Sequence, residues 1–87
     1  SADLAVILAV ISSFRNQPLP RQLVVFGEVG LAGEIRPVPN GPERLREAAK
    51  HGFTKAIVAA ANAPKKPLPG MEVVAVRNIS QALDALS

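Results

Sequence analysis

Residues 26–45 constrain the fold of this 87-residue chain more than any other stretch. Leu23–Phe26 is a short β-branched and aromatic run, and residues 34–38 alternate polar and apolar side chains, as strands do. Between them, Gly30 and Gly33 stand three apart and allow the positive φ that tight turns require. We therefore predict a β-hairpin of these two runs around a turn at residues 30–33.

A helix is predicted directly after the hairpin, over residues 42–51. Asn40 is a favoured N-cap residue, Gly41 and Pro42 suit the first helical positions, and Glu43 adds negative charge to the first turn. Gly52 is the expected C′ residue.

This helix is expected to be amphipathic. The apolar residues at i, i+3 and i+4 are predicted to face inward, and two i, i+3 ion pairs are predicted on the exposed side. The inward residues are Leu45, Ala48 and Ala49, and the pairs are Glu43 with Arg46 and Glu47 with Lys50.

Residues 2–14 predict an earlier helix whose stretch 4–11 is apolar on every side, so it needs cover on both faces. The sequence starts at Ser1, directly before this helix, and we expect covering strands to precede it. On its own the chain should expose apolar surface here and self-associate. Residues 16–20, with two prolines, should end the helix.

The second half predicts strands at residues 54–59 and Glu72–Val76, an irregular loop at 60–70, and a closing helix to residue 86, capped by Asn78 or Ser80. Helices alternate with strands, so the two strands should be parallel neighbours. The fold class is α/β (α+β).

Composition limits the chemistry. The chain has no cysteine and one histidine, so no zinc site and no other metal is implied. The apolar run at 4–11 is far shorter than the roughly 20 residues that span a bilayer, so we expect a soluble, cytoplasmic protein without a membrane partner. A net charge of +3 favours an anionic partner, although such a charge is also ordinary for solubility.

The motif at residues 27–38 (GEVGLAGEIRPV), followed by a capped helix and by residues 47–58, resembles the proteolytic domain of the Lon protease family. Residues 26–38 and 47–53 are most similar to the Lon-like C-terminal domain of the RadA (Sms) family of bacterial DNA repair and recombination proteins. The resemblance covers nearly the whole chain. It implies one domain, residues 1–87, that is the later part of a ribosomal-protein-S5-domain-2-like fold without its first strands.

Lon-type proteases use a serine nucleophile with a lysine base, and the resemblance places these two positions at Ser1 and Pro42. Proline has no side-chain base, and the nearby Arg44 and Arg46 stay protonated, so none of the three can replace the lysine. Asp3 also departs from the glycine of the family. The favoured interpretation of Ser1 is a helix N-cap or simply the first residue. We expect no peptidase activity; a Ser/Lys serine peptidase is the alternative.

The RadA resemblance implies a scaffold and oligomerisation domain within a ring-forming, ATP-dependent DNA branch-migration protein. The hexameric ring and the contact with DNA belong to that parent protein. A phosphate-binding Gly-x-x-x-x-Gly-Lys-Ser/Thr loop is absent here. ATP with Mg²⁺ and zinc are therefore implied only for upstream domains, and no cofactor is expected in residues 1–87.

Basic residues are the candidate DNA contacts. They lie at the hairpin end, on the following helix and in the long loop: Arg36, Arg44, Arg46, Lys50, Lys65 and Lys66. One interpretation is a ring channel that binds phosphates without reading sequence. The other is the solvated face of an amphipathic helix, neutralised by Glu43 and Glu47.

Overall fold

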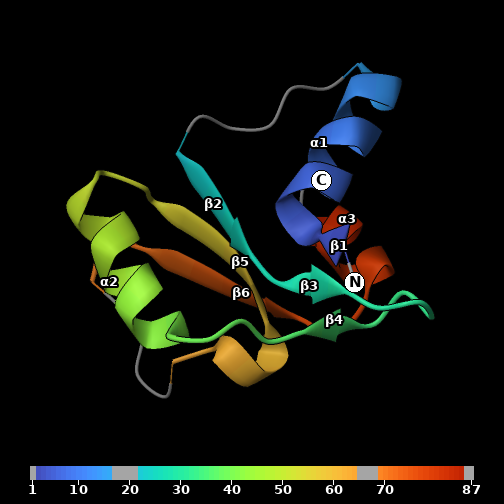
Figure 1. The fold of residues 1–87 in the computed structure, drawn as a ribbon. Helices are drawn as coiled ribbons and strands as arrows, with labels where there is room; N and C mark the ends of the chain where they lie inside the picture. The colour runs from blue at the N-terminus through green and yellow to red at the C-terminus, as the bar shows by residue number, and fades with distance from the viewer. Residues whose placement is uncertain (1, 17–21, 65–68, 86–87) are drawn as a thin grey trace.

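The computed structural model describes residues 2–16, 22–64 and 69–85, and Figure 1 shows the arrangement of their helices and strands. The helices are α1 (Leu4–Arg15), α2 (Gly41–Lys50), α3 (Ile79–Ala85) and the short 3-10 helix η1 (Ala60–Asn62). The strands are β1 (Ala2–Asp3), β2 (Leu23–Phe26), β3 (Glu28–Val29), β4 (Ile35–Arg36), β5 (Lys55–Ala59) and β6 (Glu72–Val76). The predicted α/β class is confirmed.

Two small sheets organise the chain. The larger one is parallel with the order β2-β5-β6, and the smaller one is antiparallel with the order β1-β3-β4. The prediction that β5 and β6 are parallel neighbours is therefore confirmed, with Ile57 opposite Val74.

The hairpin forms, but Leu23–Phe26 is not its first strand. β2 pairs with β5, and the hairpin consists of β3 and β4 around the predicted turn. The chain changes sheets at Gly27, whose carbonyl accepts a hydrogen bond from the Leu4 amide at 3.0 Å. A Cβ on Gly27 would lie 2.9 Å from Ile35 Cγ2, so only glycine fits here without a shift. In the turn, Gly33 has the required positive φ of 85°.

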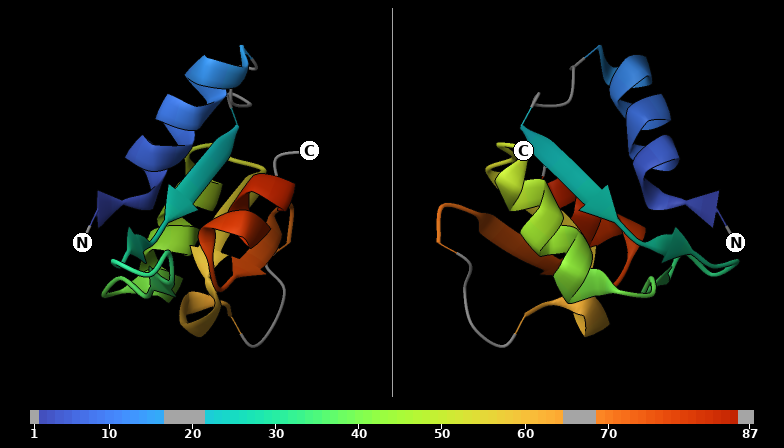
Figure 2. Two further views of the ribbon diagram at one scale, coloured as in Figure 1. Left: turned by 90° about the vertical axis from the view of Figure 1, so that its right-hand side faces the viewer. Right: turned by 60° about the vertical axis from the view of Figure 1, so that its left-hand side comes forward.

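The larger sheet carries a layer of helices on each face, as the two views of Figure 2 show. Alternate residues of β5 pack against the helices on opposite faces of the sheet, as expected for a buried strand. Ala56 and Val58 pack with Leu45 of α2, and Ile57 packs on the opposite side with Leu8 of α1. A central strand buried on both faces thus joins the two halves of the core.

Helix α1 begins two residues later than predicted, because Ala2–Asp3 is a strand and Asp3 is the N-cap. The Asp3 side chain accepts a hydrogen bond from the Ala5 amide at 2.8 Å. Ser1, which the sequence suggested as the N-cap, lies outside the described residues.

The described residues bury only one side of α1. Leu4 and Leu8 are buried, whereas Val6, Val10 and Phe14 are 60%, 50% and 88% exposed. The prediction that this chain alone leaves apolar helix surface exposed is confirmed. Burial on every side is not found here.

The observed bounds of α2 agree with the predicted ones to within a residue. However, the side chain of Asn40 does not cap the helix. Asn40 has a left-handed backbone, with φ 61°, rather than the extended one from which an N-cap side chain reaches the first turn. At the other end the prediction is confirmed. Gly52 has φ 89°, its amide donates to the Ala49 carbonyl, and the Phe53 amide donates to the Ala48 carbonyl.

The segment after β5 is less irregular than predicted, because Ala60–Asn62 forms η1. Asn62 holds this turn against the segment before α2: its Oδ1 accepts from the Val38 amide at 2.8 Å and its Nδ2 donates to the Val38 carbonyl at 2.9 Å. Asn78 caps α3 as predicted, accepting from the Gln81 amide at 2.9 Å.

Among the described residues, none of the helices combines the length and the apolar character needed to cross a bilayer.

Candidate functional site

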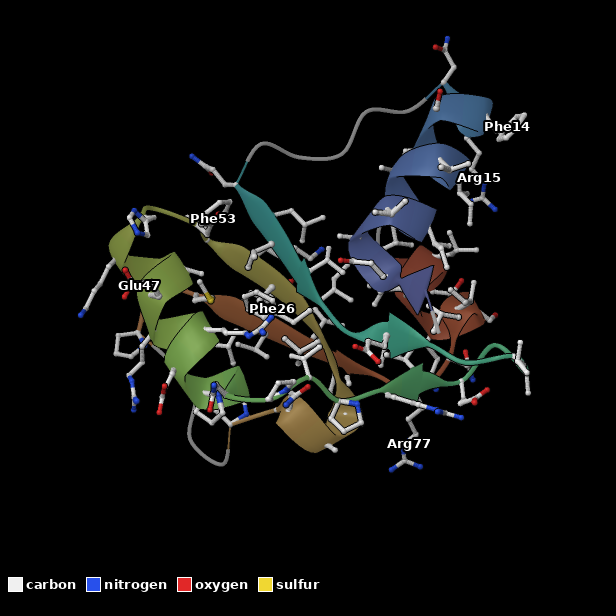
Figure 3. The ribbon with its side chains drawn as sticks, in the orientation of Figure 1. Phe14, Arg15, Phe26, Glu47, Phe53 and Arg77 are labelled. Carbon is white, nitrogen blue, oxygen red and sulfur yellow. The ribbon has the colours of Figure 1, made fainter. Side chains whose placement is uncertain are left out.

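The start of α1 and the first turns of α2 meet at one surface pocket of about 450 Å³. Asp3 reaches it from the N-cap of α1, Arg44 from α2, and Glu28 from β3. Backbone pairing holds two of these groups together, because Asp3 lies opposite Glu28 in the β1–β3 register. Gly27, Val25, Phe26, Val38 and Pro39 complete the lining, and Figure 3 shows Phe26 near the centre of the sheet.

The dyad positions that the Lon resemblance implies are Ser1 and Pro42, and neither belongs to the described lining of this pocket. Ser1 lies outside the described residues, so its distance to the pocket is not part of the geometry. Pro42 is exposed in the first turn of α2 and carries neither a base nor an N–H donor. The described lining contains two carboxylates and one guanidinium, and it lacks a hydroxyl, an imidazole or an amine. These groups can bind a charged ligand, but they do not form a nucleophile–base pair.

The candidate DNA contacts do not form one cluster. Arg44 and Arg46 are two residues apart, about 200° around the helix axis, so they project from opposite flanks of α2. Lys50 follows Arg46 by one turn and shares its flank. Lys65 and Lys66 lie outside the described residues.

Arg36 is tied to a neighbour on its own strand. Its Nη2 donates to Glu34 Oε1 at 3.1 Å. A hydrogen bond from the Glu34 backbone amide, with smaller contributions from Arg36 and the Ala32 amide, holds the pKa of the Glu34 carboxyl below its usual value. The carboxylate is therefore charged at neutral pH and offsets the positive charge of Arg36.

The two ion pairs predicted on α2 are wrong. His51 Nε2 lies 3.2 Å from Glu47 Oε1, one full turn away, and Lys50 does not pair with Glu47. Glu43 and Arg46 form no ion pair in the described structure either. Each exposed pair of this kind contributes only a few tenths of a kcal/mol, which is too little to fix long side chains. Arg46 and Lys50 thus remain available on the surface.

Sequence reasoning missed two features of this region. Glu28 was not recognised as a pocket residue, and Arg77, exposed between β6 and α3, was left out of the basic group. Residue spacing carries a weak signal for Glu28, which precedes the glycine turn by two positions. Residue spacing carries no signal for Arg77, because its position depends on the contacts of its backbone with β4 and α3. The described residues hold no cluster of three histidine, cysteine, aspartate or glutamate side chains suited to a metal ion.

Comparison with known proteins identifies one matching family model and several DNA repair proteins. The model described as subunit ChlI of Mg-chelatase matches residues 1–62. RadA from Salmonella typhimurium, named a DNA repair protein, is 68% identical over 83 residues, which cover 95% of this chain and 18% of the relative.

Two further DNA repair proteins named RadA extend this similarity. The protein from Escherichia coli K12 is 66% identical over the same shares of both chains. The protein from Bacillus subtilis is 44% identical over 93% of this chain and 18% of the relative. The chain thus spans a little under a fifth of the length of these relatives.

Proposed function

Because this chain belongs to the family described as subunit ChlI of Mg-chelatase and matches part of the DNA repair proteins called RadA, we propose a role in recombinational DNA repair. It acts there as the Lon-like scaffold domain of a RadA-type, ATP-dependent DNA branch-migration protein. The 68% identity to RadA carries this proposal. The model's description names a chelatase subunit, but the close relatives are repair proteins, so the proposal follows them.

The domain is proposed to be non-catalytic. Its resemblance to Lon places a lysine base where Pro42 stands, and Arg44, the nearest cationic side chain in the pocket, cannot accept a proton at neutral pH. A serine at position 1 would therefore have no base to activate it. ATP hydrolysis, with its Mg²⁺, and zinc binding belong in this proposal to other parts of the parent protein.

Assembly is the proposed task of the domain. Val6, Val10 and Phe14 form an apolar stripe at i, i+4 and i+8 on α1, with half or more of each side chain exposed. Such a stripe tends to be covered by a partner surface. In the parent protein this surface contributes, directly or through the preceding chain, to a hexameric ring.

DNA contact is proposed for the flank of α2 that carries Arg46 and Lys50. Both are exposed, and neither has an ionic partner among the described residues. Cations of this kind bind phosphates without reading bases, and a ring sums their individually weak contributions. Arg44 and Arg36 contribute less, because one faces a pocket with two carboxylates and the other pairs with Glu34. The proposed place of action is DNA in the bacterial cytoplasm.

The proposal is tested on the full-length protein with two assays on one preparation. One measures ATP-dependent branch migration of a synthetic recombination intermediate, and the other measures cleavage of casein and a fluorogenic peptide from about pH 6 to 10. We expect branch migration, no cleavage, and unchanged branch migration in Ser1→Ala. Cleavage that Ser1→Ala abolishes would establish the peptidase alternative. Absence of branch migration in a preparation that hydrolyses ATP would contradict the repair role.

A further inference from the structure

The outer edge of β6 carries backbone groups that no described residue bonds. β6 is an edge strand, and the Glu72 amide donates to the Thr54 carbonyl at 2.9 Å on the β5 side. Parallel pairing alternates along a strand, so Val74 and Val76 also turn their N–H and C=O groups toward β5. The backbone groups of Val73 and Ala75 therefore point outward, where no described residue bonds them.

This free stretch has a defined end. At Arg77 the outward carbonyl accepts from the Ile35 amide of β4 at 2.9 Å, and the amide donates to Gln81 Oε1 at 2.7 Å. An added strand would therefore have to end before Arg77, where β4 and α3 already bond the backbone. Its register is set by Val73 and Ala75 alone.

A hollow of about 660 Å³ lies beside this edge. Val74 and Val76 form its apolar floor, and Gln81 and Asp84 of α3 form a polar wall. Ala75 is exposed at the rim and small, so it leaves room for the side chains of an added strand. The edge lacks the proline and the bulge by which proteins usually block strand addition.

The two ends of the hollow carry opposite charges. Arg77 stands at the C-terminal end of β6, and Figure 3 shows its side chain projecting outward beside β4. α3 then runs back along β6, since the Ala85 carbonyl accepts from Lys55 Nζ at 2.9 Å and Lys55 lies opposite Glu72. Asp84 therefore stands toward the N-terminal end of β6. Neither Arg77 nor Asp84 has an ionic partner in the described part of the chain.

We propose that the outer edge of β6 binds an extended peptide segment of a protein partner. The segment adds to the sheet as a short strand, hydrogen-bonded to Val73 and Ala75. It places an acidic side chain near Arg77 and a basic side chain near Asp84. Only a polypeptide main chain offers donors and acceptors in the alternation that this edge presents, and the two charges set the direction of the segment.

The test uses the full-length protein and a fluorescein-labelled peptide of alternating valine and threonine with an aspartate and a lysine four residues apart. Binding is measured by fluorescence anisotropy. The first control is the same peptide with every second backbone nitrogen methylated, which keeps the side chains and removes the donors. The first variant is Ala75→Pro, which removes an outward N–H and no bond of the β5–β6 ladder.

We expect saturable binding by the unmodified peptide and about tenfold weaker binding in Ala75→Pro, since one main-chain hydrogen bond and its neighbour's geometry are lost. The methylated peptide should bind no better than that. The second variant, Asp84→Lys, tests the charges on an exposed site that the core does not need. This variant should weaken binding of the peptide, and binding should recover when the lysine of the peptide is replaced by aspartate.

Three results would overturn the proposal. The first is binding that does not saturate up to about 1 mM peptide. The second is methylated peptide that binds as tightly as the unmodified one. The third is an Ala75→Pro variant whose oligomeric mass changes while its peptide binding does not. The last result would assign the edge to a second copy of the chain.

Discussion

Replacing Asn62 by alanine should loosen the segment that leads into α2. Asn62 is 8% exposed, and its side chain bonds both backbone groups of Val38, at 2.8 and 2.9 Å. Asn62→Ala removes both bonds. Each contributes about 1 kcal/mol, and Val38 is half-buried, so water replaces them only in part. We therefore expect a loss of about 2 kcal/mol, local to this segment.

The assay is amide hydrogen exchange of the full-length protein, followed on the peptide that covers residues 36–41. A loss of about 2 kcal/mol corresponds to about 30-fold faster exchange of the protected amides. Asn78→Ala is the matched control, because it removes the cap of α3 and should speed exchange in residues 79–85 alone. Exchange of residues 36–41 that changes by less than about twofold in Asn62→Ala would refute the reasoning.

Three further predictions concern assembly, DNA and catalysis. Val10→Asn should reduce self-association of residues 1–87 in light scattering, because Val10 lies half-exposed on the apolar stripe of α1; an unchanged concentration dependence would rule out that stripe as the contact. Arg46→Ala combined with Lys50→Ala should weaken DNA binding of the full-length protein and flatten its dependence on salt, by about one unit of slope for each phosphate that is no longer neutralised. The exposed Arg15→Ala should change neither. A parental slope in the double variant would remove this flank from the DNA path. Pro42→Lys should not become a peptidase, since the pocket offers its new amine no assured orientation; labelling by a serine-reactive probe would contradict this.

Local signals in the sequence predict the ends of most elements correctly. Gly52 ends α2 because only glycine adopts its φ without strain, and Asn78 caps α3 through a bond to a residue three positions away. Both depend on neighbours in sequence. The same holds for the turn at Gly33.

Sheet membership depends on contacts between distant residues and was predicted less well. Leu23–Phe26 has the pattern of a hairpin strand, yet it pairs with β5, about thirty residues later, and the chain bends at Gly27 because Leu4 and Ile35 pack there. Asn62 lies in a stretch that looks irregular, and its role appears only once Val38 is beside it. The inference drawn from Pro42 stays a prediction, and the pocket could not be predicted from the sequence, because β1 brings Asp3 opposite Glu28.

The most direct test of the scaffold role is the mass of the full-length protein in solution, with and without residues 1–87, measured by light scattering in the presence and absence of DNA. The account predicts a ring of the size of a hexamer for the intact protein, and a smaller species when these residues are deleted. A deletion protein of unchanged subunit number, folded and still bound to DNA with parental affinity, would contradict the claim that this domain builds the assembly.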